Sequence, residues 1–227
     1  MFHELLVSWF NFVIQWGFVG VVVLMALEST IIPIPSEVVV PPAAFLIASN
    51  QMTLWGGDSM QIGFWGVVFA GTLGSYLGSV VSYGVSRSLG RVVVIRWGKY
   101  FLLSEKKLEK AEHWMRRYEA GGIFFARLLP GIRHLISIPA GLIRMPFGMF
   151  SLMTIVGSFA WCWVLAWLGV QAQKVQPNLI EDPEALVHFI KGQAHWIVLG
   201  IAALAALYFL VLKLTAKAEK KSEESAE

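Results

Sequence analysis

Long apolar stretches, separated by short polar or charged segments, make up most of this 227-residue chain. A membrane-spanning helix needs about 20 apolar residues, and three uninterrupted stretches are long enough: residues 64–86, 148–172 and 195–214. Two others, residues 18–48 and 121–146, are interrupted near their middles by proline and charged residues. The pattern predicts an all-α integral membrane protein, with a single membrane domain over residues 1–214 and a charged, disordered tail over 215–227.

The polar segments between these stretches predict their orientation. Residues 87–117 contain nine of the chain's eighteen Lys and Arg residues, and such an excess of positive charge is typical of cytoplasmic segments. Residues 64–86 then run from outside to inside, residues 148–172 run back, and residues 195–214 return the chain to a cytoplasmic C-terminus. For this topology to close, each interrupted stretch must enter and leave the membrane on the same side.

We therefore expect two re-entrant helical hairpins, each followed by a transmembrane helix, with the two pairs in opposite orientation. This is an inverted repeat, and in many transporters the broken helices of such repeats meet near the middle of the bilayer. The expected fold has an additional C-terminal transmembrane helix over residues 195–214. Residues 1–16 are too short and too aromatic to span, so they predict a helix lying at or dipping into the membrane interface.

Residues that disfavour helix mark the middle of each interrupted stretch. Pro33 and Pro35 lie in the first, and Pro130 and Gly131 lie in the second. Proline lacks a backbone donor and disfavours helix in the residue before it, and unpaired backbone groups at this depth are tolerated only against protein or water. The breaks predict a site that faces a cavity; a helix merely kinked by structural prolines is the alternative.

Two acidic residues flank the first break and two basic residues flank the second. Glu28 and Glu37 bracket the prolines, whereas Arg127 and Arg133 bracket the proline–glycine pair. A charged side chain at bilayer depth costs at least about 2.5 kcal/mol and usually faces a cavity or a partner. Because a guanidinium stays charged and its forked donors match phosphate oxygens, the arginines are a candidate phosphate site. Alternatively, each arginine only forms a buried bridge with a glutamate, and the two roles can coexist.

The two carboxyl groups have two roles open to them. An apolar setting favours the neutral form of a carboxyl, whereas a nearby arginine favours the charged form. Glu28 and Glu37 could therefore carry protons and couple transport to a proton gradient, or they could act only as counter-charges.

Composition supports a membrane protein and excludes several other classes. The chain is 56% apolar and only 15% charged, compared with roughly 25% charged in ordinary soluble domains. Cys162 is the single cysteine, so there is no disulfide framework or cysteine metal cluster. The histidines lack metal-ligand spacing, and P-loop and hydrolase motifs do not occur. We expect no metal, no cofactor, no enzyme activity and no nucleic-acid partner.

Small residues recur along one side of residues 64–86, at a spacing that lets helices approach closely. We expect a packing role for this set: Gly71, Gly74, Ser75, Gly78, Ser79 and Ser82.

The chain resembles the DedA family of bacterial membrane proteins, part of the VTT-domain (SNARE-associated) superfamily, over roughly residues 15–172. The resemblance rests on the run from Glu28 to Glu37, which ends in the order P-x-P-S-E, on a glycine-rich run over residues 74–90, and on F-x-R-x-x-P-x-x-R over residues 125–133. Many members carry Asp at the position of Ser79, and this departure puts a role for that position in doubt.

The resemblance implies paired re-entrant hairpins and a lipid-related transporter of the bacterial cytoplasmic (inner) membrane. It implies that Glu28, Glu37, Arg127 and Arg133 match positions required for function. The expected activity is to flip a lipid phosphate, undecaprenyl phosphate, with membrane lipids and protons as further partners. The alternatives are an energy-uncoupled phospholipid scramblase and a non-transporting structural or assembly factor. The oligomeric state is open, a homo-oligomer included.

Overall fold

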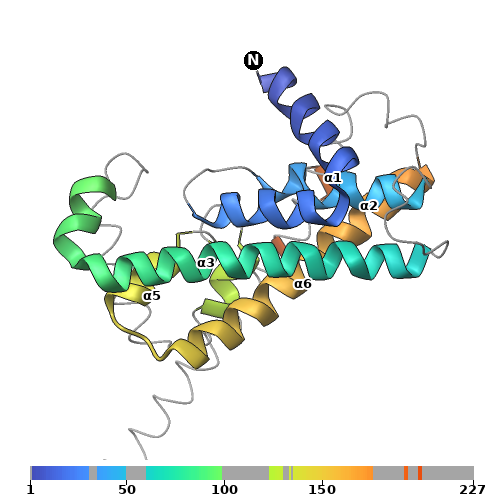
Figure 1. Cartoon of the computed structure of the whole chain (residues 1–227). Coiled ribbons are helices and arrows are strands. Elements are labelled where there is room, and N and C mark those ends of the chain that lie inside the picture. Colours follow the sequence, from blue (N-terminus) through green and yellow to red (C-terminus); the bar gives the residue numbers. More distant parts are fainter. Residues whose placement is uncertain are drawn as a thin grey trace, which may run out of the picture.

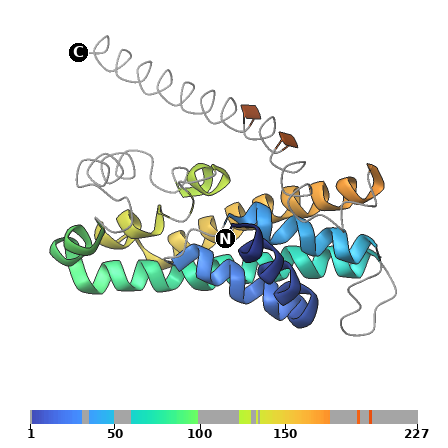
Figure 2. The same ribbon diagram turned by 90° about the horizontal axis from the view of Figure 1, so that it is seen from above.

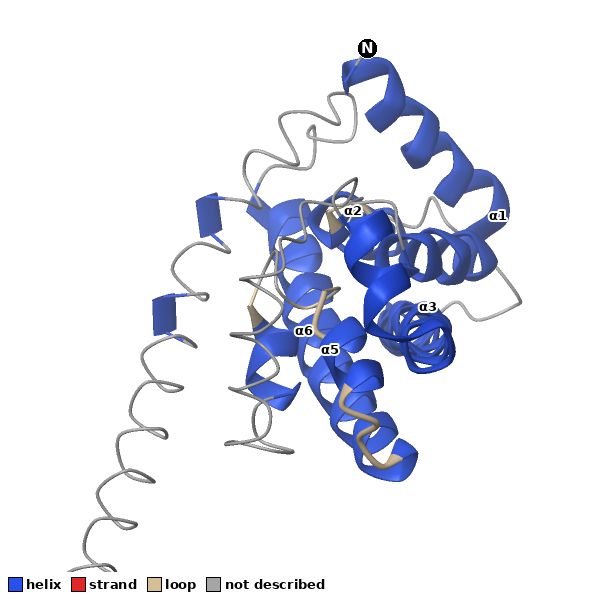
Figure 3. Cartoon of the chain, turned by 90° about the vertical axis from the view of Figure 1, so that its left-hand side faces the viewer, coloured by secondary structure: helices blue, strands red, loops and turns tan. Residues whose placement is uncertain are grey.

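The computed structural model describes residues 2–30, 35–49, 60–98, 123–129, 133, 135–175, 192–193 and 199–200. Within these ranges the regular elements are all helical, which confirms the predicted all-α class (Figure 3). In chain order they are α1 (Phe2–Thr30), the 3-10 helix η1 (Ser36–Val38), α2 (Val40–Ala48), α3 (Met60–Gly98), α5 (Ser137–Leu142) and α6 (Phe147–Val175). Residues 123–128 are also helical.

Within the part of the chain that the structure describes, three helices are long and apolar enough to cross a membrane: Asn11–Thr30, Met60–Gly90 and Phe147–Val175. They support a multi-pass membrane protein. The predicted spans 64–86 and 148–172 lie within α3 and α6. Most of the predicted span 195–214, the tail and most of the basic segment 87–117 lie outside the described residues.

The first helix joins two parts that the sequence separated. Residues 2–16 and 18–30 both belong to α1, and Gly17 between them has φ 53° and ψ −130°, a backbone conformation that glycine adopts at no steric cost. The helix bends there, and its first part points away from the other helices (Figure 1). How residues 1–16 lie relative to the membrane surface stays a prediction.

The second part of α1 packs in parallel along α3. A Cβ atom at Gly74 would lie 2.3 Å from the carbonyl oxygen of Val22, and one at Gly78 would lie 2.2 Å from the carbonyl oxygen of Ala26. Real Cβ atoms do not approach a backbone this closely, so only glycine permits the contact. The packing role predicted for Gly74 and Gly78 is confirmed.

Helix α2 runs in the opposite direction, so the chain reverses between α1 and α2 (Figures 1 and 2). Ile47 lies against Gly63 near the start of α3, and Val40 lies against Gly71 further along it. The carbonyl of Pro41 also contacts α6. Helices α1 and α2 form a helical hairpin, which we call the first hairpin. Its entry into the membrane from one side stays a prediction.

The second interrupted stretch also has two helical arms, residues 123–128 and α5 (Ser137–Leu142), which together we call the second hairpin. Residues 123–128 pack on α6, where a Cβ at Gly157 would lie 2.7 Å from Cβ of Arg127. Helix α5 packs on α3 instead, where a Cβ at Gly141 would lie 2.2 Å from Oγ of Ser86. Helices α3 and α6 cross each other in antiparallel fashion. Gly71 of α3 lies against Cys162 of α6, whereas Ser75, one turn further along α3, bonds Ser158, one turn nearer the start of α6, at 3.2 Å. Tyr76 bonds Ser151, still nearer the start of α6, at 3.1 Å.

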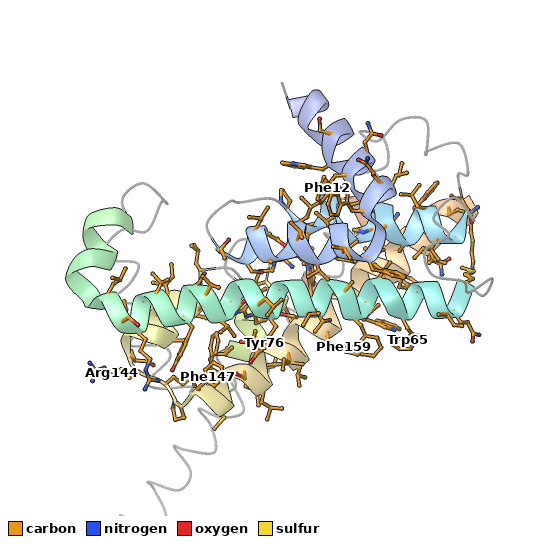
Figure 4. All side chains as sticks on the ribbon, viewed as in Figure 1. Phe12, Trp65, Tyr76, Arg144, Phe147 and Phe159 are labelled. Carbon is orange, nitrogen blue, oxygen red and sulfur yellow. The ribbon has the colours of Figure 1, made fainter. Side chains whose placement is uncertain are left out.

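The packed interior and the outer surface are both apolar. The main core cluster includes Phe45, Trp161 and Leu165, and a second cluster surrounds Tyr83 and Phe150. On the outside, apolar side chains follow α3 and α6, and some of them pair across these helices, as Trp65 and Phe159 do (Figure 4). Such exposed residues include Phe69, Leu73, Leu77, Val81, Leu152, Val156 and Trp163. An apolar exterior of this extent fits a lipid environment.

Candidate functional site

The structure joins one acidic residue of the first hairpin to one basic residue of the second. Glu28 lies in the last turn of α1, and Arg133 follows the helical residues 123–128. Their side chains form an ion pair between Arg133 Nη2 and Glu28 Oε1, although 105 residues separate them in the chain. Both residues are buried, with exposed fractions of 4% and 7%. The pair therefore sits inside the protein, where the two hairpins meet.

Two further groups surround this pair. The backbone N–H of Ser36, at the start of η1, donates to Glu28 Oε1 at 3.0 Å. The indole N–H of Trp161, in the middle of α6, donates to the Ser36 hydroxyl at 3.1 Å. The Arg133 guanidinium lies over the Trp161 ring, 5.8 Å from its centroid, within the range of a cation–π interaction. Trp161 thus contacts both hairpins at once.

A buried ion pair of this kind adds little to stability by itself. Burying an ion pair costs desolvation that its own attraction often only offsets, whereas removing one partner costs about 3–5 kcal/mol. The second carboxylate oxygen, Glu28 Oε2, is buried and has no hydrogen-bond partner among the described residues. Such an unpaired buried acceptor is uncommon in folded proteins. The carboxylate therefore keeps one oxygen that a proton or a donor could occupy.

Arg127 has a different environment from Arg133. It is one of the largest fully buried side chains, with an exposed fraction of 2%. Its Nη2 donates to the Ser137 hydroxyl at the start of α5 at 2.6 Å, and its Nε has no partner among the described residues. No ion pair joins Arg127 to Glu28 or Glu37, although the structure describes all three side chains. Its positive charge is not balanced by either glutamate.

The remaining predicted residues lie apart from the ion pair or outside the described chain. Glu37 is half-buried and accepts a long hydrogen bond of 3.4 Å from the Ser36 hydroxyl. Pro35 precedes η1 in an extended conformation, with φ −66° and ψ 128°. Three predicted residues at the breaks lie outside the described residues: Pro33, Pro130 and Gly131.

Three residues of this site were missed from the sequence: Ser36, Ser137 and Trp161. Trp161 could have been noticed from its position. Tryptophan is enriched at the membrane interfaces, whereas this one lies at the middle of α6. Ser36 stands between Pro35 and Glu37 within the interrupted stretch, where a hydroxyl could have been noted. Ser137 gave no signal of its own.

Comparison with known proteins gives a consistent set of relatives. A family model described as the VTT domain matches residues 34–171. Undecaprenyl phosphate transporter A of Bacillus subtilis (strain 168) is 31% identical, covering 88% of this chain and 90% of the relative. Its namesake in Staphylococcus aureus is 25% identical, covering 70% and 75%. A protein of Lactococcus lactis subsp. cremoris, named alkaline phosphatase-like protein, is 36% identical, covering 68% and 70%. No solved structure matches the chain significantly.

Proposed function

The chain belongs to the VTT-domain (DedA) family and is a membrane transporter rather than an enzyme, and we propose that it carries undecaprenyl phosphate across the bacterial cytoplasmic membrane. The substrate is proposed because two relatives bear the name undecaprenyl phosphate transporter A. The proposed membrane is the inner one, with the C-terminus in the cytoplasm.

The observation that carries the proposal is an imbalance of buried charge. Arg127 and Arg133 are buried, whereas among the described residues only Glu28 forms an ion pair with them. A buried charge is costly unless it is paired, so the interior favours a further anion. A phosphate fits this requirement, because guanidinium donors match phosphate oxygens in geometry as well as charge.

In the proposed mechanism, Glu28 stays paired with Arg133 while no phosphate is bound. An incoming phosphate competes with the carboxylate for Arg133, and protonation of Glu28 would favour this exchange because it removes the carboxylate's charge. Glu37, half-buried beside Ser36, is a second candidate proton carrier or counter-charge. The prenyl tail would stay in lipid beside the hairpins while the two repeats open alternately to either face of the membrane.

The test is a flipping assay with the purified full chain in vesicles that contain a fluorescent polyprenyl phosphate. We expect the wild type to accelerate movement between leaflets and to respond to an imposed proton gradient. Arg133→Ala and Arg127→Ala should abolish the acceleration. The matched control is Arg87→Ala, because Arg87 is an exposed arginine on α3 whose guanidinium donates to the Tyr83 hydroxyl.

Three other outcomes would contradict the proposal, and each would indicate a different function. Equal movement of glycerophospholipids without a gradient would indicate a scramblase. Unchanged transport in both buried-arginine variants would indicate that the charges are only internal bridges. Release of inorganic phosphate from the lipid would indicate the enzyme that the name of the Lactococcus relative suggests.

A further inference from the structure

Two buried polar atoms near the second hairpin have no hydrogen-bond partner among the described residues: Nε of Arg127 and Oγ1 of Thr154. Arg127 is 2% exposed and Thr154 is completely buried. Buried polar groups are normally paired, and an unpaired one calls for an explanation such as a functional role or a bound molecule. Two of them on facing segments point to a shared explanation.

The two atoms belong to one contact between α6 and residues 123–128. Thr154 lies three residues before Gly157, so both lie on the same face of the helix. Gly157 is where α6 meets the Arg127 side chain. One turn earlier, Phe150 packs in a cluster with Ala126 from the same segment. The side chain of Thr154 therefore lies between two points at which α6 contacts the helix that carries Arg127.

The other buried hydroxyls among the residues that the structure describes have hydrogen-bond partners. On α3, Thr72 donates to the carbonyl of Val68 at 2.7 Å, and Ser86 donates to the carbonyl of Ser82 at 2.7 Å. A Ser or Thr hydroxyl inside a helix commonly makes this bond to the preceding turn. Thr154 is equally buried in a helix and does not make it. Its hydroxyl is therefore available to a molecule that enters the contact.

Ser137 adds a third polar group. Its oxygen accepts from Arg127 Nη2 at 2.6 Å, and a hydroxyl that accepts one bond can still donate its own hydrogen. Arg127 Nε–H, Thr154 O–H and Ser137 O–H are thus three donors next to a buried positive charge. An acceptor with several negatively charged oxygens would satisfy them together.

We propose that Arg127, Ser137 and Thr154 form a phosphate subsite separate from the Glu28–Arg133 pair, and that the two hydroxyls select a phosphate monoester. This inference rests on the proposed function. A monoester presents three terminal oxygens to the three donors, whereas a diester presents two and carries a substituent in place of the third. Arg133 is already paired with Glu28, whereas Arg127 forms no ion pair with a described residue. The phosphate therefore binds first at Arg127.

The test measures binding and stability on the purified full chain in detergent. The binding probes are farnesyl phosphate, its methyl diester and inorganic phosphate, titrated by calorimetry. Thr154→Val replaces the unpaired hydroxyl with a methyl group of the same shape, and Thr72→Val is the matched control. We expect Thr154→Val to leave the unliganded melting temperature unchanged or higher, since no bond is lost. We expect its affinity for farnesyl phosphate to fall roughly tenfold, as for the loss of one hydrogen bond to a charged ligand.

The probes distinguish a lipid phosphate from free inorganic phosphate, and they test the subsite separately from the proposed transport function. The wild type should prefer the monoester to the diester, and Thr154→Val and Ser137→Ala should reduce this preference, whereas Thr72→Val should not. Binding of farnesyl phosphate that depends on Arg133 but is the same in both threonine variants would overturn the subsite and leave the proposed function standing. Binding of inorganic phosphate that depends on Thr154, without lipid transport in vesicles, would retain the subsite and overturn the function. A wild type that binds none of the probes would overturn both.

Discussion

The Glu28–Arg133 pair makes a quantitative prediction about stability. Glu28→Ala leaves a buried guanidinium without its counter-charge and leaves the Ser36 N–H without the acceptor it has at 3.0 Å. Breaking a buried pair from one side costs about 3–5 kcal/mol. At about 2–4 °C per kcal/mol for a chain of this size, the melting temperature should fall by roughly 10 °C.

The same reasoning predicts that the losses of stability caused by replacing Glu28 and by replacing Arg133 are not additive. Arg133→Met leaves a buried carboxylate, which can take up a proton, so this variant should lose less than Glu28→Ala. The double variant removes both charges at once. Its loss of stability should be smaller than the sum of the two single losses by about 0.5–3 kcal/mol, the range of coupling energies between residues in direct contact.

The assay is unfolding of the detergent-purified protein, followed by near-UV circular dichroism. Heating gives the melting temperatures, and titration with sodium dodecyl sulfate gives the differences in free energy of unfolding. Arg87→Met serves as the control, because it removes an exposed arginine and should cost less than about 1 kcal/mol. Strictly additive losses in Glu28→Ala, Arg133→Met and the double variant would refute the pairing, because two residues that do not interact show no coupling energy.

Three further predictions concern packing and positioning. Gly78→Ala should lower the stability by about 1–3 kcal/mol because its Cβ would meet the backbone of α1 at 2.2 Å, whereas Gly84→Ala, with nothing within 4 Å, should be neutral or stabilising; thermal unfolding compares the two. Trp161→Phe should keep an aromatic ring beneath the guanidinium but lose the bond to Ser36, costing about 1 kcal/mol and slowing transport; unchanged values for both would show that this bond is dispensable. Arg127→Lys keeps the charge and loses the fork, so the flipping rate should drop at least tenfold, and full activity would favour an assembly factor.

Much of the helical framework could be predicted from the sequence. Uninterrupted apolar stretches identified the regions that lie within α3 and α6, because the membrane imposes a minimum length on a span. The prolines and charges identified where the chain reverses between α1 and α2. The sequence did not predict that residues 2–16 and 18–30 form one helix that bends at Gly17. Apolar patterning indicates where a segment begins and ends, but not the conformation of a single glycine.

The partners within the site could not be predicted in the same way. The sequence offered two acids and two bases and left their pairing open. Which of them meet depends on how α6 packs between the hairpins, since Trp161 fixes Ser36 on one side and lies under Arg133 on the other. Thr154 gave no signal either, because a threonine in an apolar helix normally bonds its own backbone, and only the packed structure reveals an exception.

Each hairpin straddles the boundary between the two long helices. In the first, α1 lies on α3 while the start of α2 reaches α6 through Pro41; in the second, residues 123–128 lie on α6 while α5 lies on α3. A shear of α3 against α6 would therefore strain the contacts between the two arms of each hairpin, and also those that α2 makes with α3. The Arg127–Ser137 and Glu28–Ser36 bonds join those arms, so one sliding motion would loosen both bonds together.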